Sequence, residues 1–375
     1  MPAAVFCAVA AHRVPFIMPA VKTYAVINQK GGVGKTTTVA NLGAAIAATG
    51  HDICLIDLDP QSHLTLHYGI DTSQDAPSVY DVMTDEINVA AAVRSVAPHL
   101  SVAPATIDLA ATEIELVNTV GREQVLRDRL HAEALPCETV LIDCPPSLGL
   151  LTLNALAAAD EVLIPLQPHF LALQGLGKLL ETVSLVQRRI NPALKVTGVI
   201  FCMYETQTRL AAEVAADLAG FLEGARGADV PWSGAKVFET HIRRNVKLAE
   251  CPSHGQTIFQ YEPQSNGAED YQALAAEFLA LATNRASAAQ SQTTTQDSIQ
   301  AAEGPAGPPE SARAEAGEEL TETLADKEPR RGDSAIAQAE PPQPTPPAEP
   351  SAVDASNSQD PRPVSHGQNT PPRPE

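Results

Sequence analysis

The sequence has 375 residues, of which 45 are acidic and 25 are Lys or Arg, so its formal net charge is −20. This charge argues against a protein that coats nucleic acid over its whole surface, and any nucleic-acid site must be a local patch. The six cysteines show no C-x-x-C spacing, which argues against a cysteine metal or cluster site. No stretch is long and apolar enough to span a bilayer.

Composition divides the chain into three parts. Residues 1–19 form an N-terminal extension that faintly resembles the apolar region of a signal peptide but lacks a basic start, and Met18 is an alternative first residue. Residues 20–283 have the length and apolar content of one folded domain. Residues 284–375 are rich in Pro, Ala, Ser, Thr, Gln and Glu, so we predict a disordered, Pro-rich acidic tail.

The most informative stretch is residues 29–37, Gln-Lys-Gly-Gly-Val-Gly-Lys-Thr-Thr. It lies between an apolar run at 24–28, predicted to be a buried strand, and a helix predicted over 36–48. A glycine-rich turn at a helix N-terminus binds phosphate, because its backbone N–H groups point inward and the helix dipole favours negative charge. We therefore predict ATP binding by the following residues: Lys30, Gly31, Gly32, Val33, Gly34, Lys35, Thr36 and Thr37.

Two roles follow from the general phosphate-loop pattern. Lys35 is expected to pair with the β- and γ-phosphates, and the Thr36 hydroxyl to bind Mg²⁺. A second buried strand is predicted at 52–57, and a third at 139–143 ends in Asp143. Because a carboxylate at the end of such a strand reaches the metal in these folds, we predict that Asp143 is a magnesium ligand.

Further strands are predicted at 161–166 and 196–203, with a helix at 174–191 between them. Alternating strands and helices predict an α/β fold: a doubly wound, mostly parallel sheet with helices on both faces and nucleotide at the carboxyl ends of the strands. The region 63–138 is less informative, although 109–131 is helix-like, and 271–281 predicts a closing helix. We interpret the histidines of the first region as ordinary core or surface residues: His63, His67 and His99.

The loop departs from the general pattern because Gln29 replaces a glycine and Lys30 adds a second lysine. This variant resembles the deviant Walker A motif of the ParA/MinD family of P-loop ATPases. The stretch 55–61 resembles the family's switch I, with Asp59 at the catalytic aspartate, and 143–147 resembles switch II. The resemblance covers about residues 22–283 and implies catalytic roles for Lys30, Lys35 and Asp59, with Lys30 reaching the phosphates of a partner subunit.

Residues 236–255 resemble a late stretch of the Soj/ParA branch, in which an arginine contributes to sequence-independent DNA binding. Arg244 matches that arginine, and Arg243 and Lys247 lie beside it. The family usually has proline at the position of Arg243 and often arginine at that of Lys247. We therefore predict a small DNA-binding patch from these three residues, against the alternative of a solvated basic turn.

The resemblance implies a slow, partner-stimulated ATPase that uses Mg²⁺, forms a homodimer with ATP, binds DNA non-specifically and drives chromosome or plasmid segregation with a ParB-like activator. It further implies a cytoplasmic, nucleoid-associated protein without stable membrane association. One alternative is an orphan ParA-like ATPase that positions a protein cargo. A MinD-like membrane-cycling ATPase needs a C-terminal amphipathic helix, which the ending at 371–375 cannot form. An electron-transfer ATPase similar to nitrogenase iron protein needs thiolate ligands, for which Cys144 is the nearest candidate.

Overall fold

The computed structural model describes residues 21–72, 76–84 and 87–302. Within them one sheet of nine strands has the order β3-β4-β2-β5-β1-β6-β7-β8, and β9 pairs with β7. The strands are β1 Lys22–Val26, β2 Ile53–Asp57, β3 Arg94–Ala97, β4 Leu100–Ala103, β5 Thr139–Asp143, β6 Glu161–Leu166, β7 Lys195–Tyr204, β8 Lys236–Val237 and β9 Ile242–Arg243. Every pairing among them is parallel except that of β3 with β4. The predicted mostly parallel sheet is confirmed.

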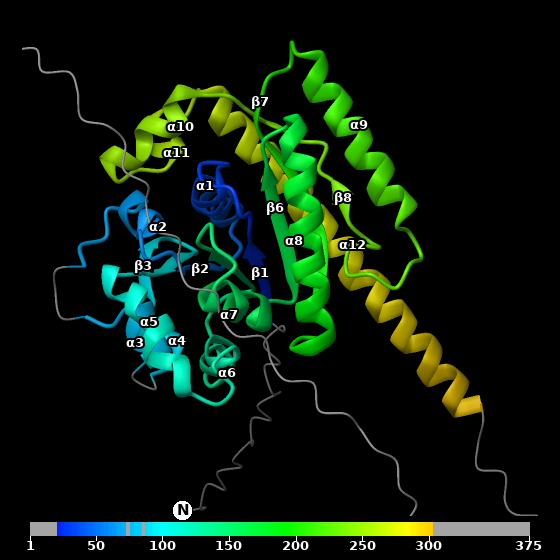
Figure 1. Ribbon diagram of the computed structural model, residues 1–375, viewed down its shortest axis with the longest axis horizontal. Helices are drawn as coiled ribbons and strands as arrows, with labels where there is room; N and C mark the ends of the chain where they lie inside the picture. The colour runs from blue at the N-terminus through cyan, green and yellow to red at the C-terminus, as the bar shows by residue number, and fades with distance from the viewer. Residues whose placement is uncertain (1–20, 73–75, 85–86, 303–375) are drawn as a thin grey trace, which may run out of the picture. The chain divides into compact units, whose positions relative to one another are not determined.

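Helices cover both faces of this sheet, with α8 in front of β6 and α12 behind it in Figure 1. The α-helices are α1 Lys35–Ala48, α2 His63–His67, α3 Val79–Thr84, α4 Val89–Ala92, α5 Thr112–Glu115, α6 Val125–His131, α7 Leu150–Ala158, α8 Phe170–Arg189, α9 Arg209–Gly224, α10 Val246–Glu250, α11 Ile258–Tyr261 and α12 Asn266–Ala302. The 3₁₀-helices are η1 Ile107–Ala111, η2 Leu116–Asn118 and η3 Cys251–His254. The predicted doubly wound arrangement is confirmed.

Alternation along the strands explains why the sheet needs helices on both faces. Successive side chains of a strand point to opposite faces, so both faces of a buried strand must be apolar. Ala25 and Ile142 belong to the core that includes α7, α8 and α9, whereas Tyr24 and Leu141 belong to the core that includes α1 and α12. In β2 all five residues are buried, which explains why the four residues before Asp57 are all apolar.

A glycine sets the distance between the first helix and the sheet. A Cβ atom on Gly43 of α1 would lie 2.7 Å from Cδ2 of Leu55 in β2. Real Cβ atoms do not approach other heavy atoms so closely, so a larger residue at this position would require the Leu55 side chain or α1 to shift. Because the phosphate-binding loop leads directly into α1, this contact also fixes the position of the loop.

The region 63–138 differs from its predicted character. Residues 109–131 do not form one helix, because a turn at Gly121, with a φ of 73°, separates η2 from α6. Val120, an apolar residue inside the stretch predicted to be helix-like, is fully exposed. The antiparallel pair β3 and β4 was absent from the prediction, because four-residue strands are too short for a clear alternating pattern.

Helix α12 is longer at both ends than the predicted closing helix. It continues through residues 284–302, which we predicted to be part of the disordered tail. The physical reason is composition, because these residues are rich in Ala and Gln and no proline occurs between Pro263 and Pro305. The predicted extension at 1–19 and the remainder of the predicted tail, from residue 303, lie outside the described residues.

The strand order brings the sequence motifs to one edge of the sheet. β5 lies between β1 and β2, and its last residue, Asp143, pairs with Val26 on one side and Asp57 on the other. The segments that follow these three strands are the glycine-rich loop, the 58–62 segment and the Cys144–Pro145–Pro146 turn. Three motifs that are far apart in sequence therefore meet at the carboxyl ends of central strands, as predicted.

Candidate functional site

The glycine-rich loop forms an open cradle in front of α1. Gly32 and Gly34 have φ values of 72° and 96°, a backbone region that favours glycine. A Cβ atom on Gly31 or Gly32 would meet nothing within 4 Å, so the space in front of the loop is free for a ligand. Val33 differs from its neighbours because its side chain is buried, so that only its backbone can contact a nucleotide.

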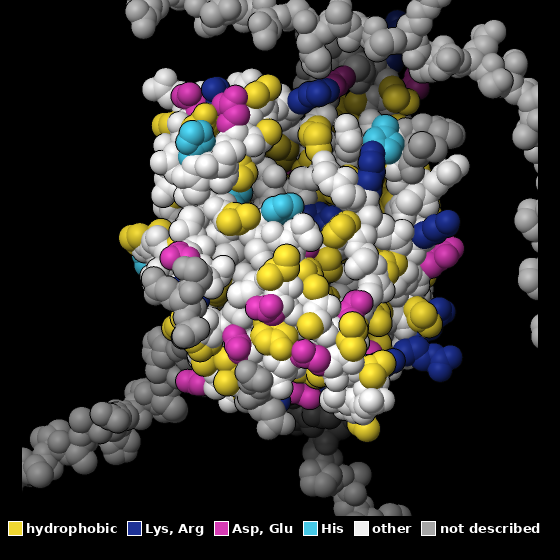
Figure 2. Space-filling model, turned by 60° about the vertical axis from the view of Figure 1, so that its left-hand side comes forward, with side chains coloured by type: hydrophobic (Ala, Val, Ile, Leu, Met, Phe, Trp, Pro, Cys, Tyr) yellow, Lys and Arg dark blue, Asp and Glu magenta, His cyan; other side chains and the backbone are white. Residues whose placement is uncertain are grey.

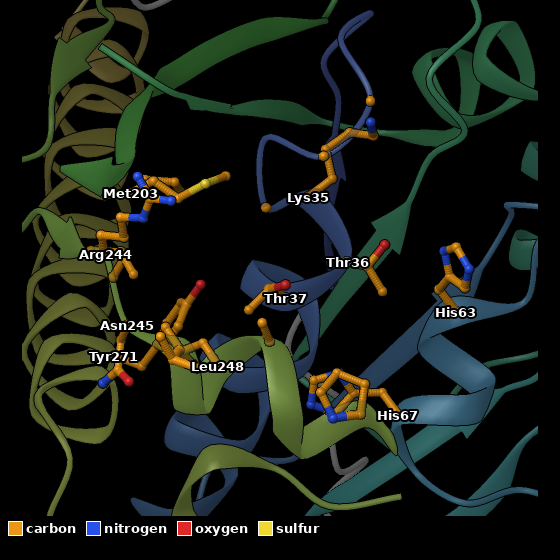
Figure 3. A pocket seen from close by; sticks show the side chains of 18 of the residues that line it. Lys35, Thr36, Thr37, His63, His67, Met203, Arg244, Asn245, Leu248 and Tyr271 are labelled. Carbon is orange, nitrogen blue, oxygen red and sulfur yellow. The ribbon is translucent and has the colours of Figure 1, made fainter. Parts of the chain in front are cut away.

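The loop lines an open pocket of about 830 Å³. Its predicted members Gly31, Gly32, Gly34, Lys35, Thr36 and Thr37 all contribute, together with Asp59. Figure 3 shows Lys35, Thr36 and Thr37 at the start of α1, opposite side chains from α2, α10 and α12. The pocket therefore brings most of the predicted nucleotide residues to one place.

Lys35 is held inside the loop and not in solvent. Its side chain is almost fully buried, and its Nζ donates a hydrogen bond to the Lys30 carbonyl oxygen at 3.3 Å. Burial lowers the pKa of Lys35, while the nearby Asp143, Cys144 and Asp59 act in the opposite direction. An ammonium group placed across the loop, with few partners of its own, suits the binding of an anionic phosphate.

Asp143 is a fully buried carboxyl group, and neither of its oxygens has a hydrogen-bond partner among the described residues. Burial and the neighbouring Asp57 raise the pKa of Asp143 well above its usual range, and Thr36 and Lys35 act in the opposite direction. A buried carboxylate is costly unless a partner compensates its charge. A hard divalent cation that binds oxygen ligands would do so, and the residues present, Asp143 and Thr36, therefore fit Mg²⁺.

Two carboxylates lie at the carboxyl end of β2, Asp57 as its last residue and Asp59 two residues later, and they have different surroundings. Asp57 accepts hydrogen bonds from the Thr65 backbone N–H at 2.8 Å, from the Thr65 hydroxyl at 2.7 Å and from the Asp59 N–H at 3.2 Å. Burial raises the pKa of Asp57 to about 6, although these hydrogen bonds lower it. Asp59 lines the pocket instead, and its Oδ1 accepts from the Gln61 N–H. Asp57 thus fixes the turn, which leaves Asp59 as the carboxylate that faces the ligand space.

Lys30 lies at the exposed rim of the loop. Its Nζ is 2.6 Å from Nε2 of His169, the residue that precedes α8. The pKa of His169 is lowered by burial and by the Lys30 charge, which is consistent with a neutral ring that accepts this hydrogen bond. Sequence reasoning missed His169, because the contact joins residues 139 positions apart.

The three predicted DNA-binding residues already pair with carboxylates of their own chain. Arg243 binds Asp270 and Glu269, with its Nε 2.9 Å from Asp270 Oδ1, and these bonds raise the pKa of Arg243. The Lys247 ammonium is 2.8 Å from Glu250.

Arg244 is the most exposed of the three. Its side chain is 72% exposed and lies 3.2 Å from that of Glu205. Arg243 and Arg244 also line the 830 Å³ pocket, so the basic stretch and the phosphate loop are neighbours in space. A second pocket of about 390 Å³ lies on their other side, beside Tyr204 and Glu205.

The remaining wall of the large pocket comes from residues that sequence reasoning did not assign. They lie on and just before α2, in the turn after β5, at the end of β7, on β9, on and just before α10, on η3 and on α12: Gln61, His63, Leu66, His67, Pro146, Cys202, Met203, Ile242, Asn245, Val246, Leu248, Ala249, Pro252, Ser253 and Tyr271. Thr38 connects α1 to α12, since its hydroxyl is 3.2 Å from the Tyr271 hydroxyl. His67 is buried, as a core histidine would be, and burial lowers its pKa to about 4.

Other chemistries have less support in the described residues. Cys54 and Cys202 are free and buried, as predicted, and burial raises the pKa of each thiol to about 12. No group of three or more His, Cys, Asp or Glu that could bind a metal occurs in the parts of the chain that the structure describes. Within the same parts, no helix is both long and apolar enough to cross a bilayer.

Comparison with known proteins agrees with this geometry. An AAA domain model matches residues 21–196. The chromosome-partitioning ATPase Soj of Treponema pallidum is 44% identical over 69% of this chain and 97% of its own length. The chromosome partitioning protein ParA of Caulobacter vibrioides is 42% identical over 70% of this chain and 96% of its own.

A solved structure matches as well. It is a cobyrinic acid a,c-diamide synthase from Mycobacterium smegmatis with bound ATP analog and magnesium, 37% identical over 69% of this chain and 94% of its own, with a TM-score of 0.57. That structure binds an ATP analog and magnesium, and the Treponema pallidum relative is named as an ATPase. Its identity to curated relatives over more than two thirds of its length shows that the chain belongs to the ParA/Soj family of deviant Walker A ATPases.

Proposed function

We propose that this chain is an ATP-dependent dimerising switch that binds DNA non-specifically and drives chromosome or plasmid segregation. The observation that carries the proposal is the meeting of a complete phosphate cradle with an unpartnered buried carboxylate, Asp143, and an exposed extra lysine, Lys30. The relatives named for chromosome partitioning support the same reading.

Each residue of the site has a separate task in this proposal. The loop N–H groups and Lys35 bind the phosphates, and Thr36 and Asp143 hold Mg²⁺, which neutralises phosphate charge when it is bound. Asp59 orients the attacking water from its position in the pocket, while Asp57 holds the turn that carries Asp59.

Dimer formation engages Lys30 across the subunit boundary. The lysine leaves His169, its contact in the single subunit, and reaches the phosphates bound by the partner subunit. Hydrolysis, which is slow without a ParB-like activator, removes the γ-phosphate that holds the two subunits together. The subunits then separate, and the cycle restarts with ATP binding.

DNA binding in this cycle depends mainly on Arg244. Arg243 is held by two carboxylates, whereas the Arg244 side chain is largely exposed and pairs with Glu205, which is exposed as well. An exposed ion pair contributes about 0–1 kcal/mol, so a DNA phosphate can replace Glu205 at small cost. Two subunits double the number of such contacts, which explains why DNA affinity would follow dimer formation and place the protein on the nucleoid in the cytoplasm.

The test is a gel shift with arbitrary duplex DNA, ATP and Mg²⁺, together with sizing of the same samples. Arg244→Glu should abolish binding at moderate salt and leave the ATP-dependent dimer intact, because an exposed phosphate contact acts mainly on DNA affinity. Arg226→Glu is the matched control, since Arg226 is another exposed arginine beside a glutamate. ATP affinity is measured in parallel because Arg244 lines the nucleotide pocket. An Arg244→Glu protein that dimerises and shifts DNA as the wild type does would defeat the DNA-binding role and favour positioning of a protein cargo.

A further inference from the structure

Between β4 and α6 the chain exposes several large apolar side chains. Ile107, Ile114, Val117 and Val120 are 74%, 77%, 53% and 100% exposed. They lie on η1, α5 and η2 or directly after them. We call the surface formed by these four residues and the exposed acids Asp108, Glu113 and Glu115 the apolar-acidic surface.

The fold fixes this exposure. Leu109, Thr112 and Leu116 of the same segment are buried, and both leucines belong to the core that includes α7 and α8. With these residues facing inward, a short helical turn must direct Ile114 and Val117 outward. The exposed apolar side chains are therefore held in place by an anchored segment. A concentration of such residues on an anchored surface is typical of an interaction site.

Acidic residues outnumber basic ones in the segment that carries these side chains. No Lys or Arg occurs between residues 95 and 121. Arg122, at the end of the segment, is paired with Glu123 and donates a hydrogen bond to the Val117 carbonyl. Figure 2 views the side of the molecule that carries α3 and α5, and hydrophobic and acidic side chains are intermixed over its lower half. An occupant of this surface needs positive charge beside apolar groups.

The apolar-acidic surface is connected to the nucleotide site through α7. Glu113 Oε1 accepts a hydrogen bond from the N–H of Leu150, the first residue of α7, at 2.8 Å. Asn154 of α7 bonds the Arg122 carbonyl and the Leu126 N–H. Helix α7 begins shortly after the turn containing Pro146, which lines the large pocket.

We propose that the apolar-acidic surface docks a basic amphipathic segment of a partner protein, and that docking acts on the turn before α7. This inference rests on the proposed function, for which it supplies the site of the activator. Three other occupants conflict with the charge. A second copy related by twofold symmetry would place acid against acid, the chain's own residues from 303 onward are acidic overall, and an anionic membrane surface would be repelled.

The experiment measures binding of a fluorescent amphipathic leucine–lysine peptide of about 18 residues, or five helical turns, to the full chain with ATP and Mg²⁺. Ile114→Gln combined with Val117→Gln should weaken binding by about tenfold or more, because the variant lacks two apolar side chains that the bound peptide would cover. Leu185→Gln combined with Leu210→Gln is the matched control, since both residues are about half exposed on other helices. A peptide with glutamate in place of lysine should not bind.

Glu113→Gln provides an independent readout. Measured at saturating peptide, which offsets any loss of affinity from the removed charge, it should reduce the effect of the bound peptide on the ATPase rate, because it weakens the bond to the start of α7. The inference is overturned if the wild type does not bind the peptide at low salt, or if the two double variants bind it equally.

Sizing of the same samples separates this inference from the proposed function. If the Ile114 and Val117 double variant loses the ATP-dependent dimer, the surface belongs to a second copy, and the partner-segment inference is overturned. A wild type that binds no ATP would defeat the proposed function itself. A wild type that dimerises normally and fails only in the peptide assay would defeat this inference alone.

Discussion

At the scale of single residues, three aspartates of the site differ by their surroundings. Asp57 has its oxygens occupied by Thr65 and the Asp59 N–H, Asp143 has no hydrogen-bond partner, and Asp59 lines the pocket. Asp59 and Asp143 could be predicted from the sequence, because Asp59 lies in the stretch that resembles switch I and Asp143 ends a predicted buried strand. It did not assign a role to Asp57, since its partner Thr65 is recognised only in three dimensions.

The nucleotide assignment can be tested at Lys35. Replacing Lys35 with Ala should abolish ATP binding and leave the fold intact, because the ammonium is placed across the phosphate cradle without an ion pair of its own within 4 Å among the described residues. Fluorescent ATP titration measures the effect, and Lys178→Ala, an exposed lysine on α8, is the control. Equal ATP affinity in the Lys35→Ala protein and the wild type would refute the phosphate-loop role.

His67 predicts a specific pH dependence of stability. Its folded pKa of about 4 lies below the ordinary 6.5, so the unfolded chain binds the proton more tightly and stability is lost as the pH falls through this window. Between pH 7 and pH 5 this histidine should lower the free energy of unfolding by about 2 kcal/mol. Asp57 acts in the opposite sense, because its raised pKa favours the folded state as the pH falls below about 6.

The comparison of wild type with His67→Gln isolates the histidine from Asp57. Urea unfolding at pH 7 and pH 5 should show that the variant lacks the decrease in the free energy of unfolding that His67 causes in the wild type. The same change in unfolding free energy in both proteins would mean that His67 is already solvated in the native state.

At the scale of elements, α12 is as important as the strands. Its first half places Tyr271, Leu274 and Phe278 in the core with α1, and the Phe278 ring contacts the Tyr24 ring edge-on, with centroids 4.9 Å apart. The helix therefore closes one face of the sheet and also supplies Tyr271 to the pocket. Residues 284–302 of α12 belong to the stretch that composition predicted to be a disordered tail.

Phe278→Ala tests this contribution to stability. Removing a fully buried phenylalanine should lower the free energy of unfolding by about 3–5 kcal/mol. Phe221 on α9 is half exposed, so Phe221→Ala should change it by less than about 1 kcal/mol and serves as the control. Chemical denaturation measures both, and equal small losses would show that α12 does not close the core.

Predictability from sequence varied with element type for physical reasons. The central strands and α1 were predictable, because buried parallel strands are continuous apolar runs and the glycine-rich loop marks the helix start. The β3–β4 pair and the broken segment at 107–124 were not, because short elements are decided by tertiary contacts such as that of Glu113 with α7. Contacts across the fold, such as that of Lys30 with His169, left no local pattern to read.

At the scale of the whole molecule, the single subunit has the groups that the proposal assigns to ATP binding. The cations that it assigns to the partner subunit and to DNA already have partners within the subunit. Lys30 rests on His169, and Arg243, Arg244 and Lys247 each face a carboxylate. A net charge of −20 further opposes DNA binding by one copy. The proposed cycle therefore requires a second subunit, and the mass of the particle should depend on the bound nucleotide.

Light scattering of the full chain tests that claim most directly. The Asp59→Ala protein with ATP and Mg²⁺ should have about twice the 39.5 kDa mass of one chain, because ATP binds and hydrolysis is slowed. The same protein with ADP should remain at the mass of one chain, and Lys30→Ala in the Asp59→Ala background should remain there with either nucleotide. A mass of one chain for Asp59→Ala with saturating ATP, or an equal mass with ATP and ADP, would contradict the account.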